Sequence, residues 1–473
     1  MADHTLLLKN ADLLCTMAAH PEKGPPAKTA GQANDHCGDE IKNGGLFARN
    51  GVIEAVGETQ NLPNTADRVI DMTGHVVIPG MVNTHHHMFQ NLTRAVPAAQ
   101  NAPLFGWLQT LYPIWCNLGP DHIYWSNALG MAELALTGCT TSSDHLYLYP
   151  NGARLDDSFA AANDIGMRFH GTRGSMSIGE SHGGLPPDRL TEGEPAILKD
   201  CQRVIEMYHN AERHAMQRVA LAPCSPFSVS IDLMSETAKM ARAYKVGLHT
   251  HLAENVEDID YSLNSFGMRP GEYIEAVGWV GHDVWHAHCV QLDKDEIDLF
   301  ARTDTGIAHC PCSNMRLASG IAPIREMLDA GINIGLGVDG SASNDSGHML
   351  NEARQAMLLQ RVMKTGDALT ARQSLAVATR GGAAVLGRDD IGQLSQGFAA
   401  DIAAFDCRGI DFAGAGWDLL AGLLFCGSAK TSYTIINGKV IVDQGQLVTM
   451  DMPKLLENHR AMTADLMRKA QWT

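Results

Sequence analysis

The sequence predicts an α/β chain built as a (β/α)8 TIM-like barrel, with a small β-sandwich domain formed by the two ends of the chain. Short apolar runs rich in β-branched residues alternate with longer segments of helical periodicity. The eight strand-like runs are 76–87, 140–145, 167–174, 219–224, 246–252, 284–289, 306–312 and 332–339. Eight strand–helix units over about 300 residues match the size of a closed barrel.

A doubly wound open sheet is the alternative arrangement for alternating strands and helices. That fold binds dinucleotides through a Gly-rich turn that leads from a strand into a helix. This chain lacks that fingerprint, so the sequence favours the barrel.

Strand-like segments at both ends of the chain predict the second domain. Residues 1–74 and 392–473 contain short apolar runs separated by turn residues, so we expect them to pair into one small β domain. A helical segment near the C-terminus is assigned to the same domain, and residues 75–391 are left for the barrel. Residues 18–45 are rich in Gly, Pro, Lys and Asp and show no periodicity, which predicts a long surface loop.

The composition excludes several classes of partner. The 473 residues are 45% hydrophobic and 19% charged, as in ordinary globular proteins, and the net charge of −17 repels nucleic acid. No apolar run reaches the roughly 18 residues that a membrane helix needs. The start of the chain lacks a secretory signal, and the 11 cysteines form no disulfide framework, so we expect a cytoplasmic protein.

Two histidines end the first predicted strand. Because side chains alternate along a strand, His85 and His87 point the same way, and His86 points to the opposite face. Two imidazoles that converge from one strand suit a divalent transition metal. We expect His86 to be a packing residue.

Polar residues of the same kind end three further strands. The fifth ends in His251, with Glu254 three residues later, and His249 lies one layer deeper, where we expect a supporting role. The sixth ends in His288 and the eighth in Asp339, a poor packing residue but a good metal ligand. Active sites of such barrels lie at the C-terminal ends of the strands, so these residues predict one metal site there.

The set of strand-end motifs resembles the amidohydrolase superfamily. The motifs are His-x-His after the first strand, His-x-x-Glu after the fifth, His after the sixth and Asp after the eighth. Residues 309–315, 318–323 and 339–344 resemble its branch of aromatic deaminases, which includes guanine, 8-oxoguanine, isocytosine, S-adenosylhomocysteine and triazine deaminases or aminohydrolases. The resemblance extends from about residue 5 to residue 445.

The resemblance implies one divalent metal ion, zinc or alternatively iron, with the ligands His85, His87, His251 and Asp339. It also implies that Glu254 protonates the ring nitrogen beside the attacked carbon, that His288 polarises the attacking water, and that Asp339 takes its proton. Members with two metal ions usually bridge them with a lysine of the fourth strand. The run 219–224 has no lysine, which supports a single ion.

Residues 83–94, 111–115 and 173–188 extend the resemblance over the whole chain to 8-oxoguanine deaminases, which implies hydrolysis of 8-oxoguanine to urate and ammonia. The candidate substrate contacts are Gln90, Trp115, Arg173 and Phe227. A glutamine amide offers a donor and an acceptor to a purine edge, and Phe227 is placed to stack on a ring. For Trp115 and Arg173, a purely structural role in packing or in pinning a loop is equally open.

Pro226 bears on the choice between purines. Guanine deaminases usually carry an arginine at this position, directly before the aromatic residue. Oxidation at C8 turns N7 into a hydrogen-bond donor, which a fixed cation would repel. The proline therefore favours 8-oxoguanine over guanine.

Several other functions stay open. Guanine, isocytosine and aminotriazines present the same amidine-like edge as 8-oxoguanine and fit the same residues. A non-catalytic metal-binding relative would need neither Glu254 nor His288. A polynucleotide-editing enzyme is disfavoured by the acidic charge and by the missing Pro-Cys-x-x-Cys signature. We expect a small heterocyclic substrate, no nucleic-acid or membrane partner, and a homodimer.

Overall fold

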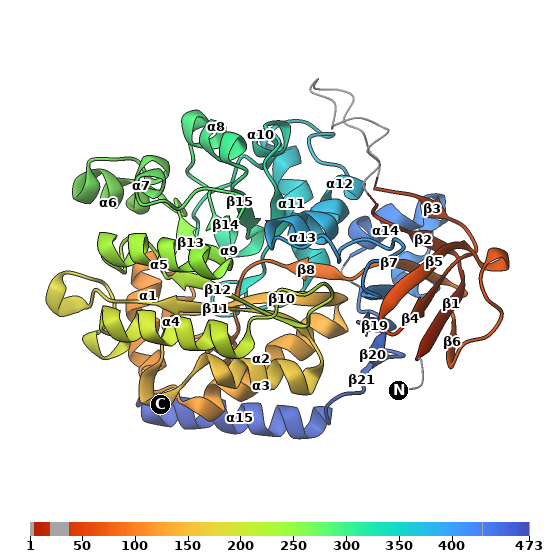
Figure 1. Cartoon of the computed structure of the whole chain (residues 1–473), viewed down its shortest axis with the longest axis horizontal. Helices are drawn as coiled ribbons and strands as arrows, with labels where there is room; N and C mark the ends of the chain where they lie inside the picture. Colours follow the sequence, from red (N-terminus) through yellow and green to blue (C-terminus); the bar gives the residue numbers. More distant parts are fainter. Residues whose placement is uncertain (1–3, 19–36, 428, 473) are drawn as a thin grey trace.

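A computed structural model describes residues 4–18, 37–427 and 429–472 of the chain. Figure 1 shows a barrel with its helices and, beside it, a smaller β domain that contains the first strands. Most of the predicted loop, residues 19–36, lies outside the described residues. Within the loop's predicted range, the short strand β3 (Glu40–Ile41) pairs with β2 (Leu13–Cys15).

Eight parallel strands close into a barrel, which confirms the predicted fold class. The strands are β8 (Met81–Asn83), β10 (Cys139–Leu146), β11 (Arg168–Ser175), β12 (Gln217–Pro223), β13 (Gly247–Leu252), β14 (Val284–His288), β15 (Gly306–His309) and β16 (Ile334–Leu336). The barrel closes where Leu336 of β16 pairs with Asn83 of β8. These strands are buried on both faces, which explains their nearly continuous apolar runs.

Helices connect the barrel strands and cover their outer face (Figure 1). The main ones are α1 (Leu104–Trp115), α2 (Pro120–Leu136), α3 (Leu155–Ile165), α4 (Glu194–Tyr208), α5 (Ile231–Tyr244), α6 (Val256–Phe266), α7 (Pro270–Ala276), α8 (Lys294–Thr303), α9 (Pro311–Arg316), α10 (Ile324–Asp329), α11 (Met349–Met363), α12 (Ala371–Ala376) and α13 (Gly382–Val385). A further helix, α14 (Leu419–Phe425), packs against α11, α12 and the strand β2. Several begin at side-chain caps, as where Asn255 accepts a hydrogen bond from the Asp258 amide at the start of α6.

The prediction of one strand over residues 76–87 is wrong, because the chain turns after Pro79. The segment divides into β7 (His75–Pro79), β8 and β9 (His86–His87), and β7 joins the sheet of the small domain. Gly80 is needed at the turn, since an added Cβ would lie 2.1 Å from the Thr140 side chain. The predicted run 332–339 divides likewise into β16 and β17 (Asp339–Gly340), and β17 pairs with β9. This pairing brings two predicted ligand segments side by side.

The small domain consists of two sheets that share an apolar core. One sheet has the order β5-β4-β1-β6 and the other β21-β20-β19-β18-β7-β2-β3. Their remaining strands are β1 (Thr5–Ala11), β4 (Gly44–Arg49), β5 (Val52–Glu58), β6 (Arg68–Asp71), β18 (Ile402–Asp406), β19 (Tyr433–Ile436), β20 (Lys439–Asp443) and β21 (Gln446–Leu447). Leu8 and Leu46 of the first sheet pack with Val77 and Ile402 of the second, as in a β-sandwich. The division of the chain at residues 74 and 392 stays a proposal.

The C-terminal helix α15 (Met452–Lys469) lies along the barrel helix α2 rather than in the small domain, where we expected it (Figure 1). Its Leu455 and Leu466 are buried, since their spacing places them on one face of the helix. His459 Nε2 lies 2.7 Å from Asn91 Oδ1, which ties the helix to the segment that follows β9.

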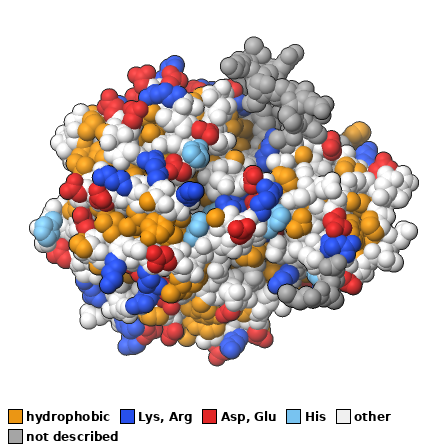
Figure 2. All heavy atoms as spheres, in the orientation of Figure 1, with side chains coloured by type: hydrophobic (Ala, Val, Ile, Leu, Met, Phe, Trp, Pro, Cys, Tyr) orange, Lys and Arg blue, Asp and Glu red, His pale blue; other side chains and the backbone are white. Residues whose placement is uncertain are grey.

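The surface carries charges of both signs. Figure 2 shows Lys and Arg side chains interspersed with Asp and Glu over the face it views, with apolar side chains between them. Among the described helices, none has both the length and the apolar character that crossing a bilayer requires.

Candidate metal centre

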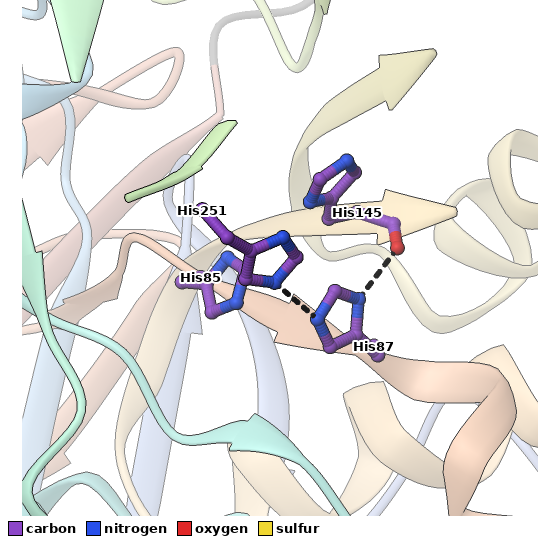
Figure 3. A group of neighbouring side chains, drawn as sticks. All are labelled: His85, His87, His145 and His251. Carbon is purple, nitrogen blue, oxygen red and sulfur yellow. Dashed lines mark hydrogen bonds between the residues drawn. The ribbon is translucent and has the colours of Figure 1, made fainter. Parts of the chain in front are cut away.

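Three imidazoles and one carboxylate converge at the C-terminal ends of the barrel strands. Nε2 of His85 lies 3.2 Å and Nε2 of His87 lies 3.4 Å from Oδ1 of Asp339. Nε2 of His251 lies 3.0 Å from Nε2 of His87. Figure 3 shows the rings of His87 and His251 with these nitrogens turned toward each other. The structure therefore brings the four predicted ligands together.

The hydrogen bonds of His87 and His251 fix which nitrogen carries the proton. Nδ1 of His87 lies 2.7 Å from the carbonyl oxygen of His145, and Nδ1 of His251 lies 2.5 Å from that of Cys224. A carbonyl oxygen only accepts, so each Nδ1 carries the proton and each Nε2 presents a lone pair. Two lone pairs thus face each other at 3.0 Å.

His249 fixes the tautomer of His85 in the same way. Nδ1 of His249 donates to the carbonyl oxygen of Trp285 at 2.9 Å, so its Nε2 accepts a hydrogen bond from Nδ1 of His85 at 2.8 Å. This leaves Nε2 of His85 as a buried lone pair with no hydrogen-bond partner among the described residues. The geometry agrees with the predicted supporting role of His249.

The charges of these groups also suit a cation. Burial lowers the pKa of His251 to about 3 and that of His85 well below its usual value, so both rings are neutral ligands. Burial alone would raise the pKa of Asp339, but the adjacent His85 ring, together with His288 and His87, holds it well below its usual range. Four acceptor atoms converge without a donor between them, and such a nitrogen and oxygen set fits a divalent metal ion.

Glu254 and His288 lie beside this cluster. Oε2 of Glu254 is 3.4 Å from Nε2 of His288, which is 3.9 Å from Oδ2 of Asp339. Ser319 Oγ donates to the other oxygen of Glu254 at 3.2 Å. Burial raises the pKa of Glu254 to about 7, against the lowering effect of His288. Burial lowers the pKa of His288, but Glu254 and Asp339 outweigh it and the net shift is upward.

The backbone at these strand ends adopts left-handed conformations. The φ angles are +48° at Ala253, +71° at His288 and +61° at Asp339. Non-glycine residues rarely adopt such angles, which cost about 1–3 kcal/mol each and concentrate at functional sites. The strand ends are therefore held in strained bends at the place where the candidate ligands and proton carriers project.

A pocket opens over the cluster. Its lining includes His87, His251, Glu254, His288 and Asp339, together with Gln90, Trp107, Tyr112, Tyr147 and Phe227. Gln90 and Phe227 thus lie where a substrate in contact with the cluster would reach them. The aromatic residues Trp107 and Tyr112 of α1 also line this pocket.

The sequence profile of the amidohydrolase family matches residues 76–441. The chain belongs to the amidohydrolase family. The match covers the barrel and the strands that return to the small domain, which confirms the family suggested by the strand-end motifs.

Individual relatives of this amidohydrolase act on different heterocycles. It is 44% identical to 8-oxoguanine deaminase of Pseudomonas aeruginosa, over 89% of this chain and 95% of that protein. It is 36% identical to hydroxydechloroatrazine ethylaminohydrolase of Pseudomonas sp. strain ADP, over 89% and 91%. Its fold matches the crystal structure of atrazine chlorohydrolase from Arthrobacter aurescens complexed with zinc, with a TM-score of 0.88, 33% identity, and coverage of 97% and 100%.

Arg173, a predicted substrate contact, lies away from the pocket lining. Its guanidinium pairs with Glu192 at 2.9 Å and Asp200 at 2.9 Å, and it stacks over the ring of Tyr149 at 4.1 Å. Its guanidinium is paired with two carboxylates of the protein, so the structure favours the alternative in which Arg173 holds its loop in place.

Trp115 is the other candidate substrate contact for which a structural role was open, and it is fully buried behind the pocket wall. Its Nε1 donates to Thr93 Oγ1 at 3.1 Å, and its ring packs against Phe89 and Trp107. The indole therefore supports the wall that Trp107 presents to the pocket. The sequence alone does not show which aromatic ring of this helix faces the pocket.

His145, at the end of β10, joins the cluster although we did not predict it. It lies with His85, His87 and His251 in a group whose ligand atoms are within 4.8 Å of one another (Figure 3). Its Nε2 lies 2.8 Å from the Ala222 carbonyl oxygen, and its Nδ1 is buried without a partner among the described residues. The signal was available, because His145 ends the second predicted strand as the other candidates end theirs.

Proposed function

We propose that this amidohydrolase is a metal-dependent deaminase that hydrolyses the exocyclic C–N bond of 8-oxoguanine at C2, giving urate and ammonia. The observation that carries the proposal is the convergence of four acceptor atoms beside the Glu254–His288 pair on one pocket. The similarity to an 8-oxoguanine deaminase supports the choice of substrate.

His85, His87, His251 and Asp339 would hold the ion, and their fit rests on the lone pairs that face one another in the cluster. When bound, a divalent ion supplies Lewis-acid activation of water at neutral pH. The imidazole nitrogens and the carboxylate oxygen suit zinc and iron alike, and we prefer zinc because the related atrazine chlorohydrolase structure is complexed with zinc.

The acidic and basic side chains divide the proton transfers. Glu254, held by Ser319, would deliver a proton to the ring nitrogen beside C2, which lets that carbon accept the water oxygen. Asp339 would take one proton of the water and pass it to the amino group, which leaves as ammonia, and the second proton of the water would return to Glu254 as the C2 carbonyl forms. His288 would orient the water, since it lies between both carboxylates.

Gln90 and Phe227 would position the substrate ring. Oε1 of Gln90 is buried with no hydrogen-bond partner among the described residues, so the amide is available to a purine edge. Gly340 keeps space for it, because a Cβ there would lie 1.8 Å from Oε1. Phe227 contacts Phe105 edge to face, with 5.5 Å between ring centroids, and presents an apolar surface to the pocket.

Aminotriazines are the competing substrate class, since two relatives named above act on triazines. Steady-state rates of ammonia release from 8-oxoguanine, guanine, isocytosine and a hydroxylated aminotriazine separate the candidates. We expect the highest kcat/KM for 8-oxoguanine. A higher value for guanine or the triazine would refute 8-oxoguanine as the substrate, and the assignment as a deaminase would still hold.

A homodimer in the cytoplasm also stays a prediction.

A further inference from the structure

A second cavity lies at the opposite, N-terminal end of the barrel strands. Its lining includes Arg218 near the start of β12, Gly247 at the start of β13 and Trp285 near the start of β14. The metal centre lies at the other ends of the same strands, where His251 and His288 project. The two sites are therefore separated by the length of the barrel.

Cations outnumber anions around this cavity. Arg218, Arg242 and Lys245 line it, and Asp283 is the single carboxylate among its lining residues. Asp283 is engaged already, because its Oδ2 lies 3.2 Å from Nε of Arg242. The cavity is therefore locally positive, although the chain as a whole is acidic, with a net charge of −17.

Arg218 differs from the other arginines buried in the barrel. Arg168 pairs with Asp401 at 2.8 Å, and Arg388 pairs with Asp390 at 2.7 Å. The half-buried Arg218 has no carboxylate within ion-pair distance among the described residues.

The few contacts of Arg218 are long. Its two terminal nitrogens donate to the carbonyl oxygens of Gly387 at 3.3 Å and Ala211 at 3.4 Å. Its Nε is buried without a partner in the part of the chain that the structure describes. Burial, together with the charge of Arg388, lowers the pKa of Arg218 to about 10, because the opposing effect of Asp390 and Asp389, which pair with other arginines, is smaller. Taking a guanidinium charge out of water in this way is costly unless an anion lies beside it.

Two histidines add further donors to the cavity lining. Arg388 can only donate, so Nε2 of His170 at 3.3 Å accepts, and the neutral ring carries its proton on Nδ1. The Val219 amide donates to Nδ1 of His209 at 3.2 Å, so that ring carries its proton on Nε2. Each ring thus retains one N–H donor, and both residues line the cavity.

We propose that this cavity binds a small oxyanion of the phosphate class, either free phosphate or a phosphate ester. Guanidinium, ammonium and imidazole groups lie among its apolar lining residues, and an anion with several oxygens is a ligand that can accept from more than one of them. Arg218 is its central contact, and Lys245, which is exposed at the end of α5, is an outer one.

Fluorescence of Trp285 would report the binding of an anion in this cavity. This residue lines the cavity, and its ring stacks on His249 at a centroid distance of 4.8 Å and an angle of 18°. Because His249 holds the metal-site residue His85, the two ends of the barrel share this one buried contact. Binding of an anion beside the indole would change its fluorescence.

Titration calorimetry and tryptophan fluorescence with the full chain test the proposal. The probes are inorganic phosphate and glycerol 3-phosphate at constant ionic strength, with sodium chloride as the reference salt. We expect saturable binding by at least one probe, and the probe that binds more tightly identifies free phosphate or an ester. Absence of saturable binding by both probes at millimolar concentration would overturn the proposal.

Variants locate the site. Arg218→Gln is expected to weaken binding at least about tenfold, since it removes charge-assisted hydrogen bonds, and Lys245→Gln to weaken it less. Arg460→Gln on α15 is the matched control and should bind as the wild type does. If Arg218→Gln does not fold, the exposed Lys245→Gln still decides between weakened and unchanged binding. Unchanged binding in the variants, or equal loss in Arg460→Gln, would contradict the site.

Discussion

The two ends of the barrel present opposite kinds of unsatisfied polar atoms. At the C-terminal end, lone pairs of His85, His87 and His251 face each other and a carboxylate of Asp339. At the N-terminal end, the charged and polar side chains of a largely apolar lining are mainly donors, with Arg218 foremost. The kind of polar atom left without a protein partner indicates the charge of the ligand, which we propose to be a cation at one end and an anion at the other.

The two ends also differ in exposure, which sets the size of the expected effects. The four candidate metal ligands are buried or nearly so, whereas Arg242 and Lys245 at the other end are exposed to solvent. Interactions between exposed charges are weakened by water and salt. Substitutions at the C-terminal end should therefore have much larger consequences, and the predictions below follow that order.

The largest effect is expected for His251→Ala. Removing one of the converging nitrogens should abolish metal binding and reduce activity to background, while the chain stays folded. Metal content, circular dichroism and ammonia release measure the three quantities. The matched control is His182→Ala, an exposed histidine outside the pocket lining, which should behave as the wild type. Full metal content in His251→Ala would show that the facing lone pairs of this cluster do not bind the metal ion.

Glu254→Gln should keep the metal and lose catalysis. The amide has no proton to give the ring nitrogen, so we expect kcat/KM to fall by about 100-fold or more with unchanged metal content. Glu257→Gln, an exposed neighbour on α6, is the control. Near-normal turnover by Glu254→Gln would show that the proton comes from another group.

The alternation of side chains along strands was readable from the sequence because it is local. It placed His85 and His87 on one face, and the strand-end positions of His251, His288 and Asp339 completed the cluster. The period of strands and helices likewise predicted the closed barrel.

Features that depend on distant contacts were not readable. The docking of α15 on α2 joins segments more than 300 residues apart, and the partners of Arg173 lie in an aperiodic loop and in α4. The turn at Gly80 follows from the close approach of Thr140. The N-terminal cavity collects residues from many strand starts and carries no motif. Such arrangements arise from packing rather than from periodicity.

His249→Ala tests whether the support of His85 matters. Without the hydrogen bond from His85 Nδ1 to His249 Nε2, the ring of His85 loses its fixed tautomer. We expect metal affinity to fall by roughly 10- to 100-fold, measured by competition with a chelator. His249→Gln, which keeps an acceptor, should recover part of the affinity. Wild-type affinity in both variants would assign His249 to packing alone.

Phe227→Ala and Arg173→Gln separate the pocket lining from its surroundings. We expect Phe227→Ala to raise KM by about 2- to 10-fold, because an apolar ring contact is lost. Arg173→Gln should lower Tm with little change in KM, since its ion pairs hold a loop outside the pocket. A larger KM effect for Arg173→Gln than for Phe227→Ala would reverse the assignment.

The central claim is that the facing lone pairs at the C-terminal end bind one divalent cation. Elemental analysis of the purified protein, after loosely bound metal has been removed with a weak chelator, tests it most directly. We expect about one equivalent of metal per chain, zinc in preference to iron, and none in His251→Ala. A chain that retains two equivalents, or a fully active chain that retains none, would contradict it.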